Sequence, residues 1–427
     1  MPATLIEVKG TQVKIELTVA LGRSMLDTEE RIQEALNEAG SLASREALKY
    51  FDTDGSPIQI GLEIWRTKGQ QPKCYQTPYG EVEVARHVYQ RSGGGATYCP
   101  LERDARIVIT STPRFAKQVS SKLAQGVARE VQRDLAENHA RPVAVSYLQR
   151  LGEAIGTVVQ VKEAEWEYAL PALDATVASV AVGLDGTGLL LGEDGWRQAM
   201  VGTLALFDAA GERLHTLYVA ATPEYGKATF LGRLERELAR VKAAYPEVTY
   251  LGLADGAEDN WRFLTPHTAV QLVDFYHASS YLQAVAGAAF PRAEDQKQRA
   301  TWLTDACHRL KHEPDAARAL LQEMKRLPTA GLSALHRQQL QSAITYFYYH
   351  HHQMNYAAAL EHHWPIGSGV TEAACKTVVK QRLCRSGMRW KEKGAAVVLS
   401  LRALLLTPDR WRQFWEKLDQ FGFPVAT

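Results

Sequence analysis

The chain has 427 residues, of which 46% are hydrophobic and 23% charged, and its formal net charge is +1. This composition excludes a disordered or fibrous protein, and the length predicts about two to four structural units because a single hydrophobic core stops growing below this size. A near-zero net charge is compatible with a nucleic-acid enzyme, since carboxylates around metal ions can offset a basic surface.

The first ten residues lack the basic stretch and apolar run of a secretory signal, and the apolar segment 395–406 is too short to cross a bilayer. We therefore expect a soluble cytoplasmic protein that has no contact with membranes. The five cysteines are odd in number and form no C-x-x-C pair, which favours reduced thiols.

The first half of the chain predicts three regions. Residues 1–50 form a strand and helix region, because alternating apolar residues over 4–21 indicate strands and 24–50 indicates a helix. Residues 51–112 form a small β-rich domain with Gly and Pro turns.

Residues 113–172 return to helical spacing and predict a helix-turn-helix DNA-binding domain. Residues 143–155 are the candidate recognition helix, and Arg150 is its candidate DNA contact. An ordinary helical hairpin is the alternative.

From residue 176 onward the pattern predicts an α/β domain, in contrast to the α+β character of the N-terminal part. We expect strands at 177–185, 198–208, 213–221, 248–254 and 269–275, with helices at 226–244 and around Trp261. This order makes a mixed sheet of three antiparallel strands extended by two parallel ones, which is the RNase H-like arrangement. Residues 173–290 are its first part, 291–364 a helical insertion, and 365–427 its last part with the C-terminal helices.

Three acidic residues stand where such a sheet would gather them. Asp185 closes the first predicted strand and Asp255 the fourth, and these strands are neighbours in the predicted sheet. Glu372 belongs to a predicted helix, 368–385, that would pack across the same edge. Clustered carboxylates repel one another unless a cation neutralises them, and Mg²⁺ (or Mn²⁺) prefers such oxygen ligands. A pair of these ions about 3.5–4 Å apart supports in-line phosphoryl transfer.

Each acid has an ordinary alternative reading. Asp before Gly at a strand end is a common turn. Glu361, Glu258 and Asp259 compete with Glu372, but two of them follow Asp255 too closely to come from an opposing helix, and Glu361 precedes the break at 364–365.

A basic segment follows Glu372 and predicts a DNA-binding surface with one stacking aromatic residue. Its candidate residues are Lys376, Lys380, Arg382, Arg385, Arg389 and Trp390. A solvated helix face is the alternative.

Several segments together resemble DDE transposases of ISKra-type insertion sequences. They are 183–188 (GLDGTG), 253–261 (LADGAEDNW), 274–278 (DFYHA), 367–372 (GSGVTE), 77–84 (TPYGEVEV), 87–90 (HVYQ) and 98–102 (YCPLE). The resemblance implies that Asp185, Asp255 and Glu372 are the catalytic and metal-binding triad. It also implies that Asp274 and His277 form an Asp-x-x-His element that supports the active site, with a buried structural histidine as the alternative.

The resemblance further implies an enzyme that cuts DNA at the terminal inverted repeats of a mobile element and joins it to target DNA. It also implies a homodimer or larger assembly, which is associated with the nucleoid when it is bound to DNA. Related N-terminal domains carry paired cysteines, but Cys74 and Cys99 have no partners at metal spacing, so zinc is not expected. The competing functions are an RNase H-like nuclease or resolvase, and a catalytically inactive domesticated transposase that only binds DNA.

Overall fold

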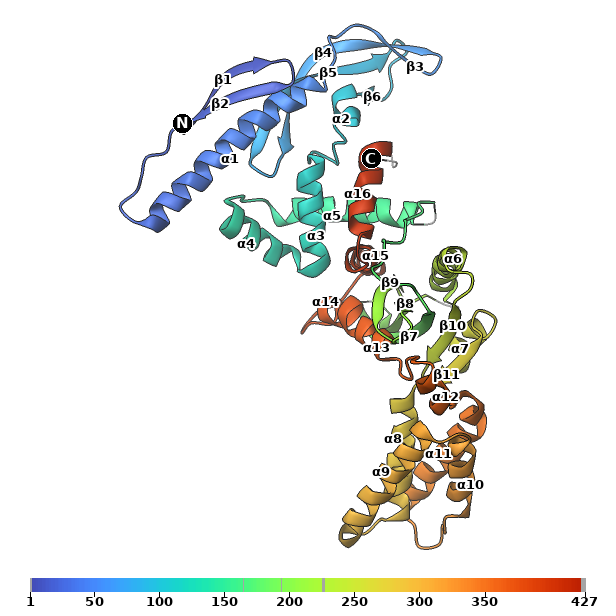
Figure 1. Ribbon diagram of the computed structural model, residues 1–427. Helices are drawn as coiled ribbons and strands as arrows, with labels where there is room; N and C mark the ends of the chain where they lie inside the picture. The colour runs from blue at the N-terminus through green and yellow to red at the C-terminus, as the bar shows by residue number, and fades with distance from the viewer. Residues whose placement is uncertain (1, 164, 193, 225–226, 424–427) are drawn as a thin grey trace. The chain divides into compact units, whose positions relative to one another are not determined.

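The computed structural model describes residues 2–163, 165–192, 194–224 and 227–423 (Figure 1). The chain is mixed α/β, with 51% helix and 22% strand. It divides into two compact units. Unit 1 contains the described residues up to 169 together with 396–405 and those from 409 onward, and unit 2 contains 170–395 and 406–408.

Unit 1 begins with a two-stranded antiparallel sheet and a long helix. Strands β1 (Ala3–Lys9) and β2 (Gln12–Leu17) precede helix α1 (Met25–Tyr50). Ser24 caps α1, because its hydroxyl accepts a hydrogen bond from the backbone N–H of Asp27 at 3.1 Å. The predicted strand and helix region is confirmed.

A four-stranded antiparallel sheet follows. Its strands lie in the order β3 (Ile58–Ile60), β4 (Glu63–Gln76), β5 (Glu81–Arg91) and β6 (Thr97–Tyr98). The short helix α2 (Pro100–Asp104) covers a core that contains Tyr75, Val82, Val84 and Leu101. The strands expected over 51–112 are present, and they belong to unit 1 together with the other described residues up to 169.

Three helices follow this sheet, as predicted. They are α3 (Pro113–Gln125), α4 (Ala128–His139) and α5 (Val145–Lys162), and they pack around Phe115, Leu135 and Ile155. Helix α5 begins two residues later than residue 143, and Val143 lies in the preceding loop, where its carbonyl oxygen accepts a hydrogen bond from the Gln132 side chain at 2.8 Å. DNA contact by these helices stays a prediction.

The expected placement of the C-terminal helices is wrong. Most of helix α15 (Glu392–Leu406) and all of α16 (Arg410–Phe421) belong to unit 1 instead of the sheet domain assigned to 365–427. The reason is packing, because both helices complete the three-helix core. The contributing side chains are Val397, Leu401, Leu404, Phe414, Trp415 and Leu418.

Unit 2 contains a five-stranded sheet in the order β11-β10-β7-β8-β9. The strands are β7 (Ser179–Leu191), β8 (Gly195–Phe207), β9 (Arg213–Ala221), β10 (Thr249–Ala254) and β11 (Val270–Val273). The first three pair antiparallel, β10 pairs parallel with β7, and β11 pairs parallel with β10, so the predicted mixed topology is confirmed.

Strand β7 is longer than expected. It was predicted to end at Asp185, but residues 186–191 stay paired with β8 as far as Gly195. Asp185 is therefore a mid-strand residue, and the alternative of a routine Asp-Gly turn does not apply to it.

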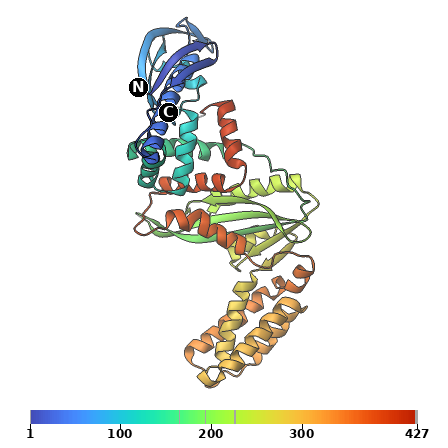
Figure 2. The same cartoon turned by 60° about the vertical axis from the view of Figure 1, so that its left-hand side comes forward.

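Helices cover the sheet of unit 2. Helix α6 (Ala228–Ala244) follows β9 and packs Phe230 and Leu234 against Gly202 of β8. The short helix α7 (Glu258–Leu264) follows β10. Helix α13 (Gly369–Ala374) contacts β7 and β8, and Figure 2 shows this orange-red helix lying across the sheet.

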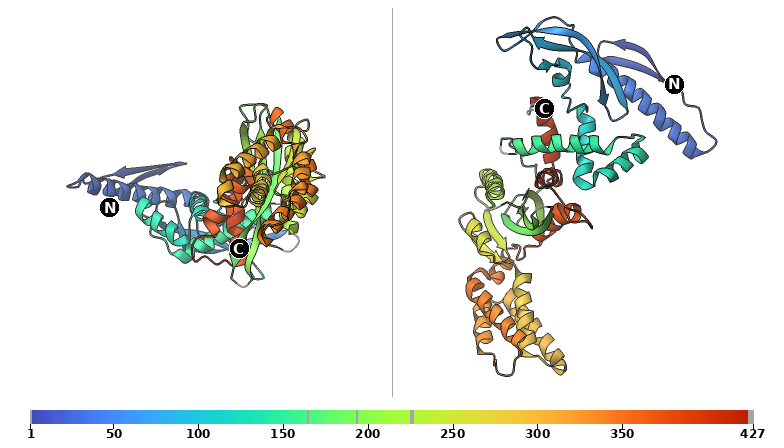
Figure 3. Two further views of the ribbon diagram at one scale, coloured as in Figure 1. Left: turned by 90° about the horizontal axis from the view of Figure 1, so that it is seen from below. Right: turned by 180° about the vertical axis from the view of Figure 1, so that it is seen from behind.

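The helical insertion begins earlier than the predicted residue 291. Its helices are α8 (Phe275–Ala289), α9 (Gln296–His312), α10 (Ala316–Arg326), α11 (Ala334–His350) and α12 (Tyr356–Glu361). Helix α8 belongs to this group because it packs along α9 and α11, and the bundle is visible in the further views of Figure 3.

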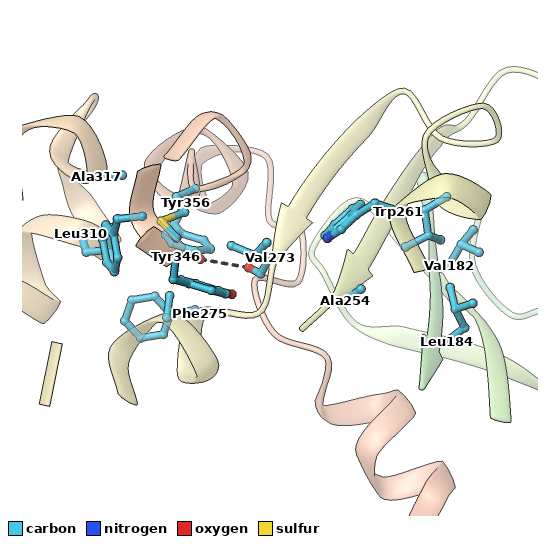
Figure 4. Packing of buried hydrophobic residues seen from close by; sticks show 14 of the residues in the cluster. Val182, Leu184, Ala254, Trp261, Val273, Phe275, Leu310, Ala317, Tyr346 and Tyr356 are labelled. Atoms are coloured by element: carbon cyan, nitrogen blue, oxygen red, sulfur yellow. Dashed lines mark hydrogen bonds between the residues drawn. The ribbon is translucent and has the colours of Figure 1, made fainter. Parts of the chain in front are cut away.

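One apolar core joins the helical insertion to the sheet. It runs from Val182 and Ala254 on the strands to Phe275, Tyr346 and Tyr356 in the helices (Figure 4). The Tyr356 hydroxyl also donates to the carbonyl oxygen of Val273 at 2.9 Å. Across the ranges that the structure describes, no helix combines the length and apolar character that a membrane span needs.

Candidate active site

Asp185 lies on β7, and Asp255 directly follows the end of the neighbouring parallel strand β10. Leu253 of β10 pairs with Gly183 of β7, so two residues further along the chain from each brings the aspartates side by side. Both line a pocket of about 370 Å³ at this edge of the sheet. The predicted meeting of these two acids is therefore present in the structure.

The turn after β10 fixes Asp255. Its Oδ1 accepts the backbone N–H of Ala257 at 3.2 Å, and its carbonyl oxygen accepts the Tyr346 hydroxyl at 3.0 Å. Gly256 has a φ of +108°, and a Cβ there would stand 2.9 Å from the Tyr346 ring, so only glycine fits this turn. The helical insertion thus holds the backbone of the candidate catalytic residue.

Asn260 is a buried site residue that the sequence reasoning missed. Its side-chain amide lies 3.3 Å from the Leu184 carbonyl oxygen and 3.4 Å from Asp255 Oδ1, so it links the two aspartate-bearing strands. The sequence did hold a signal for Asn260, because this residue lies inside the segment 253–261 and on the first turn of the helix after Asp255.

The surroundings of Asp185 disfavour its charge. Burial raises the pKa of Asp185, and the negative charges of Asp255 and Glu372 raise that pKa further. Two contacts oppose this effect, because Oδ1 accepts the Gly186 N–H at 2.6 Å and Oδ2 lies 3.6 Å from the Cys375 thiol, which donates to it. A bound cation would relieve the repulsion among these carboxylates.

Cys375 is a second residue that the sequence reasoning missed. It lies three residues after Glu372, where the helix passes from α13 into a π-helical turn (Cys375–Lys380) and then into α14 (Gln381–Leu383). Burial, and then the charge of Asp185, raise the pKa of Cys375 to about 12, so the thiol stays a neutral donor. Irregular π turns of this kind are frequent at functional sites.

Close packing fixes the helix that carries Glu372. The hydroxyls of Thr371 and Thr203 are 2.7 Å apart, and a Cβ on Gly183 would stand 2.1 Å from Thr371 Oγ1. Glycine at position 183 is therefore required for α13 to lie this near the sheet. Glu372 follows Thr371 and is exposed.

Asp274 ties this helix to the helical insertion. It is buried, and its Oδ1 accepts the N–H of His277 at 2.5 Å and so caps α8. Its Oδ2 accepts the N–H of Ser368 at 2.5 Å and lies 3.0 Å from the Ser368 hydroxyl, which is also 2.9 Å from Glu372 Oε1. Ser368 is the N-cap residue of α13, but its hydroxyl donates to these two carboxylates and makes no side-chain cap hydrogen bond.

The side chain of His277 is exposed, so the alternative of a buried histidine is wrong. Its ring meets the rings of Tyr281 and Tyr346 edge-on, with centroids 5.5 Å apart in each case. Its backbone N–H, and not its imidazole, makes the link to Asp274.

The third acid, Glu372, lies outside the pocket that the two aspartates line. Glu372 acts on the pKa of Asp185, but it does not line the pocket that Asp185 and Asp255 share. In the described ranges, no group of three or more His, Cys, Asp or Glu residues has the arrangement of a metal site. The rivals Glu258 and Asp259 do line the pocket, as do Gln198 and Lys227, two residues that the sequence did not single out.

The basic residues after Glu372 divide into two sets. The side chains of Lys376, Lys380, Arg385 and Arg389 are exposed, as is Arg150 on α5 of unit 1. Arg382 is buried with its guanidinium 5.2 Å from the Trp390 ring, and Trp390 donates its indole N–H to the Leu383 carbonyl at 2.8 Å. Arg382 is therefore too buried to offer a phosphate contact at the surface, whereas DNA contact by the half-buried Trp390 stays a prediction.

No protein-family model matches this sequence, and no curated protein matches it either.

Proposed function

We propose that this protein is a DNA transposase of an insertion sequence, which cleaves DNA strands at element ends and transfers them by metal-dependent phosphoryl transfer. The observation that carries the proposal is the pair Asp185, on β7, and Asp255, just past the end of the neighbouring parallel strand β10, which line one pocket. The order of the five strands supports an RNase H-like assignment for this sheet.

The carboxylate oxygens of this site are the donors that hard divalent cations prefer, although the three acids do not stand in the arrangement of a metal site within the described ranges. Asp185, Asp255 and Glu372 would hold Mg²⁺ or Mn²⁺, which accept carboxylate and phosphate oxygens and, as a pair, activate an attacking oxygen and stabilise a leaving one. The raised pKa of Asp185 supports this, since a site that disfavours its own negative charge gains most from a cation.

Residues in the pocket and around it have roles in holding the substrate and the acids. Lys227 lines the same pocket, where its ammonium lies 3.8 Å from Asp259, and would supply a positive charge to a DNA phosphate bound there. Asn260 and the Cys375 thiol orient the two aspartates, and Asp274 with Ser368 holds the start of the Glu372 helix. The exposed Lys376, Lys380, Arg385 and Arg389 would bind the DNA backbone nearby.

The test is cleavage of DNA that carries the regions flanking the coding sequence, in the presence of Mg²⁺ or Mn²⁺. Asp185→Asn, Asp255→Asn and Glu372→Gln should each lower cleavage at least about 100-fold, because loss of a mere outer-shell partner already costs about 10–100-fold. DNA binding should be retained. Glu361→Gln is the matched control, since this exposed glutamate should cleave like the unmodified chain.

Adding an intact target duplex separates the competing functions. A transposase joins the cleaved 3′ end to the target, whereas a nuclease or resolvase gives cleavage products alone. Retained cleavage in any of the three acid variants would reject that residue as a ligand, and tight DNA binding with no metal-dependent product would favour the inactive DNA-binding protein.

A further inference from the structure

A second pocket lies on the helical insertion. It has a volume of about 460 Å³ and opens between helices α8 and α11. Its lining consists of Tyr281, Gln338, Gln341, Ser342, Thr345, Tyr346, Tyr349 and His350. Among these described lining residues none is Asp, Glu, Lys or Arg, so the pocket fits a neutral group.

Aromatic rings form one wall of this pocket. Tyr281 and Tyr346 are stacked with centroids 4.2 Å apart and planes inclined by 17°, and the His350 ring lies 4.7 Å from Tyr346. Tyr349, on the next turn, is 63% exposed, which leaves a large ring face open to a ligand. Stacked and open rings of this kind are platforms for nucleobases.

The polar part of the wall comes from one face of α11. Gln338, Gln341 and Thr345 present amide and hydroxyl groups, which donate to and accept from the edge of a base. Arg337 is exposed and lies four residues before Gln341, so it stands one helical turn away on the same side, within reach of a phosphate.

The pocket adjoins the candidate active site. Tyr346 lines the pocket and also donates to the carbonyl oxygen of Asp255 at 3.0 Å. A Cβ on Gly256 would meet both Tyr346 and His350, so the turn after Asp255 lies directly against the pocket wall. Figure 4 shows Tyr346 beside Val273 and Phe275, where the sheet meets the helical insertion.

We propose that this pocket binds an unpaired base of single-stranded DNA, with Tyr349 stacking on the base and the α11 amides contacting its edge. This inference rests on the proposed function, because it takes DNA as the substrate of the neighbouring carboxylates. A base held here would keep a single strand next to Asp255. A duplex would have to unpair and unstack a base before that base could enter the pocket, so a single strand should bind there more tightly than a duplex.

The test measures affinity for a short fluorescein-labelled single-stranded DNA and for the matching duplex, by fluorescence anisotropy without divalent metal. Tyr349→Ala should weaken single-strand binding about 10-fold, the usual effect of removing one stacking platform, and leave duplex binding unchanged. Tyr349→Phe should bind like the unmodified chain, because stacking needs the ring and not the hydroxyl.

Tyr50→Ala is the matched control. Tyr50 ends helix α1 of unit 1, is 68% exposed and does not line the pocket, so its loss should not change affinity. Unchanged single-strand affinity in Tyr349→Ala, or equal losses for the single strand and the duplex, would overturn the proposal. The binding assay involves no cleavage. The pocket proposal can therefore fail while the acid variants lose cleavage as proposed, and the acid variants can keep cleavage while Tyr349→Ala loses single-strand affinity.

Discussion

At the scale of single residues, two similar Asp-Gly pairs have different physical causes. Asp185 and Gly186 lie inside a strand, where Gly186 continues the pairing of β7 with β8. Asp255 and Gly256 lie in a turn, where Gly256 adopts a φ of +108° against the Tyr346 ring. The same dipeptide therefore places one carboxylate on an extended backbone and the other at a strand end, and the two meet because of the register between the strands.

Glu102 of the small β-rich domain gives a prediction at this scale. Burial alone would raise the pKa of Glu102, but hydrogen bonds from Lys73 and Tyr75 and the charge of Arg86 outweigh it and lower the pKa from 4.5. A lowered pKa stabilises the folded state above pH 4.5, and that stabilisation is lost as the pH falls through the folded-state pKa.

We expect Glu102→Gln to reduce the free energy of unfolding of unit 1 by about 1–2 kcal/mol at neutral pH, a value discounted for partial exposure. The difference from the unmodified chain should shrink below about pH 4.5. Urea denaturation across this pH range is the measurement, with Glu63→Gln as the control because its ion pair with Arg91 is exposed. A difference in the free energy of unfolding that grows as the pH falls would contradict a lowered pKa of Glu102.

At the scale of elements, the site depends on how closely α13 lies on the sheet. Thr371 contacts Thr203 through their hydroxyls and occupies the space that a side chain at Gly183 would need. Asp274 then holds Ser368 at the start of the same helix through its Oδ2. The position of Glu372 thus follows from one missing side chain and one buried carboxylate, both remote from it in sequence.

Gly183→Ala should therefore displace α13 from the sheet. We expect a loss of about 1–3 kcal/mol in the stability of unit 2 from overpacking, accompanied by a loss of metal-dependent cleavage. Gly188→Ala in the same strand is the control, since its Cβ would meet only Trp196 at 3.4 Å and should change stability by less than about 0.5 kcal/mol. Thermal unfolding and cleavage assays report both effects, and equal behaviour of the two variants would exclude the packing argument.

At the scale of the whole molecule, the chain returns to its first unit at its end. Phe414, Trp415 and Leu418 of α16 are buried in the same core as Phe115 of α3, nearly 300 positions earlier in the sequence (414 − 115 = 299). The N-terminal unit is therefore incomplete until the C-terminal helices have been made, while the sheet of unit 2 has its own core.

Phe414→Ala should destabilise unit 1 by about 3–5 kcal/mol, because it empties a fully buried site. Hydrogen exchange should then accelerate in α3, α5 and α16 and stay slow in β7 and β10. Phe421→Ala on the same helix is the control, since that ring is largely exposed and should cost under about 1 kcal/mol. Equal acceleration in both units would show that they unfold together.

The sequence alone determined most of the local structure. Alternating and helical apolar spacing is a property of neighbouring residues, so the strand order of unit 2, the three helices 113–162 and the meeting of Asp185 with Asp255 could be predicted. Only the tertiary structure decided which distant segments share a core, and therefore that α15 and α16 belong to unit 1. It also decided that Arg382 packs on Trp390. The residues that it brought to the site of the two aspartates are Asn260, Cys375 and Lys227. These outcomes depend on side-chain packing and contacts between residues far apart in the chain, which no periodicity along the sequence records.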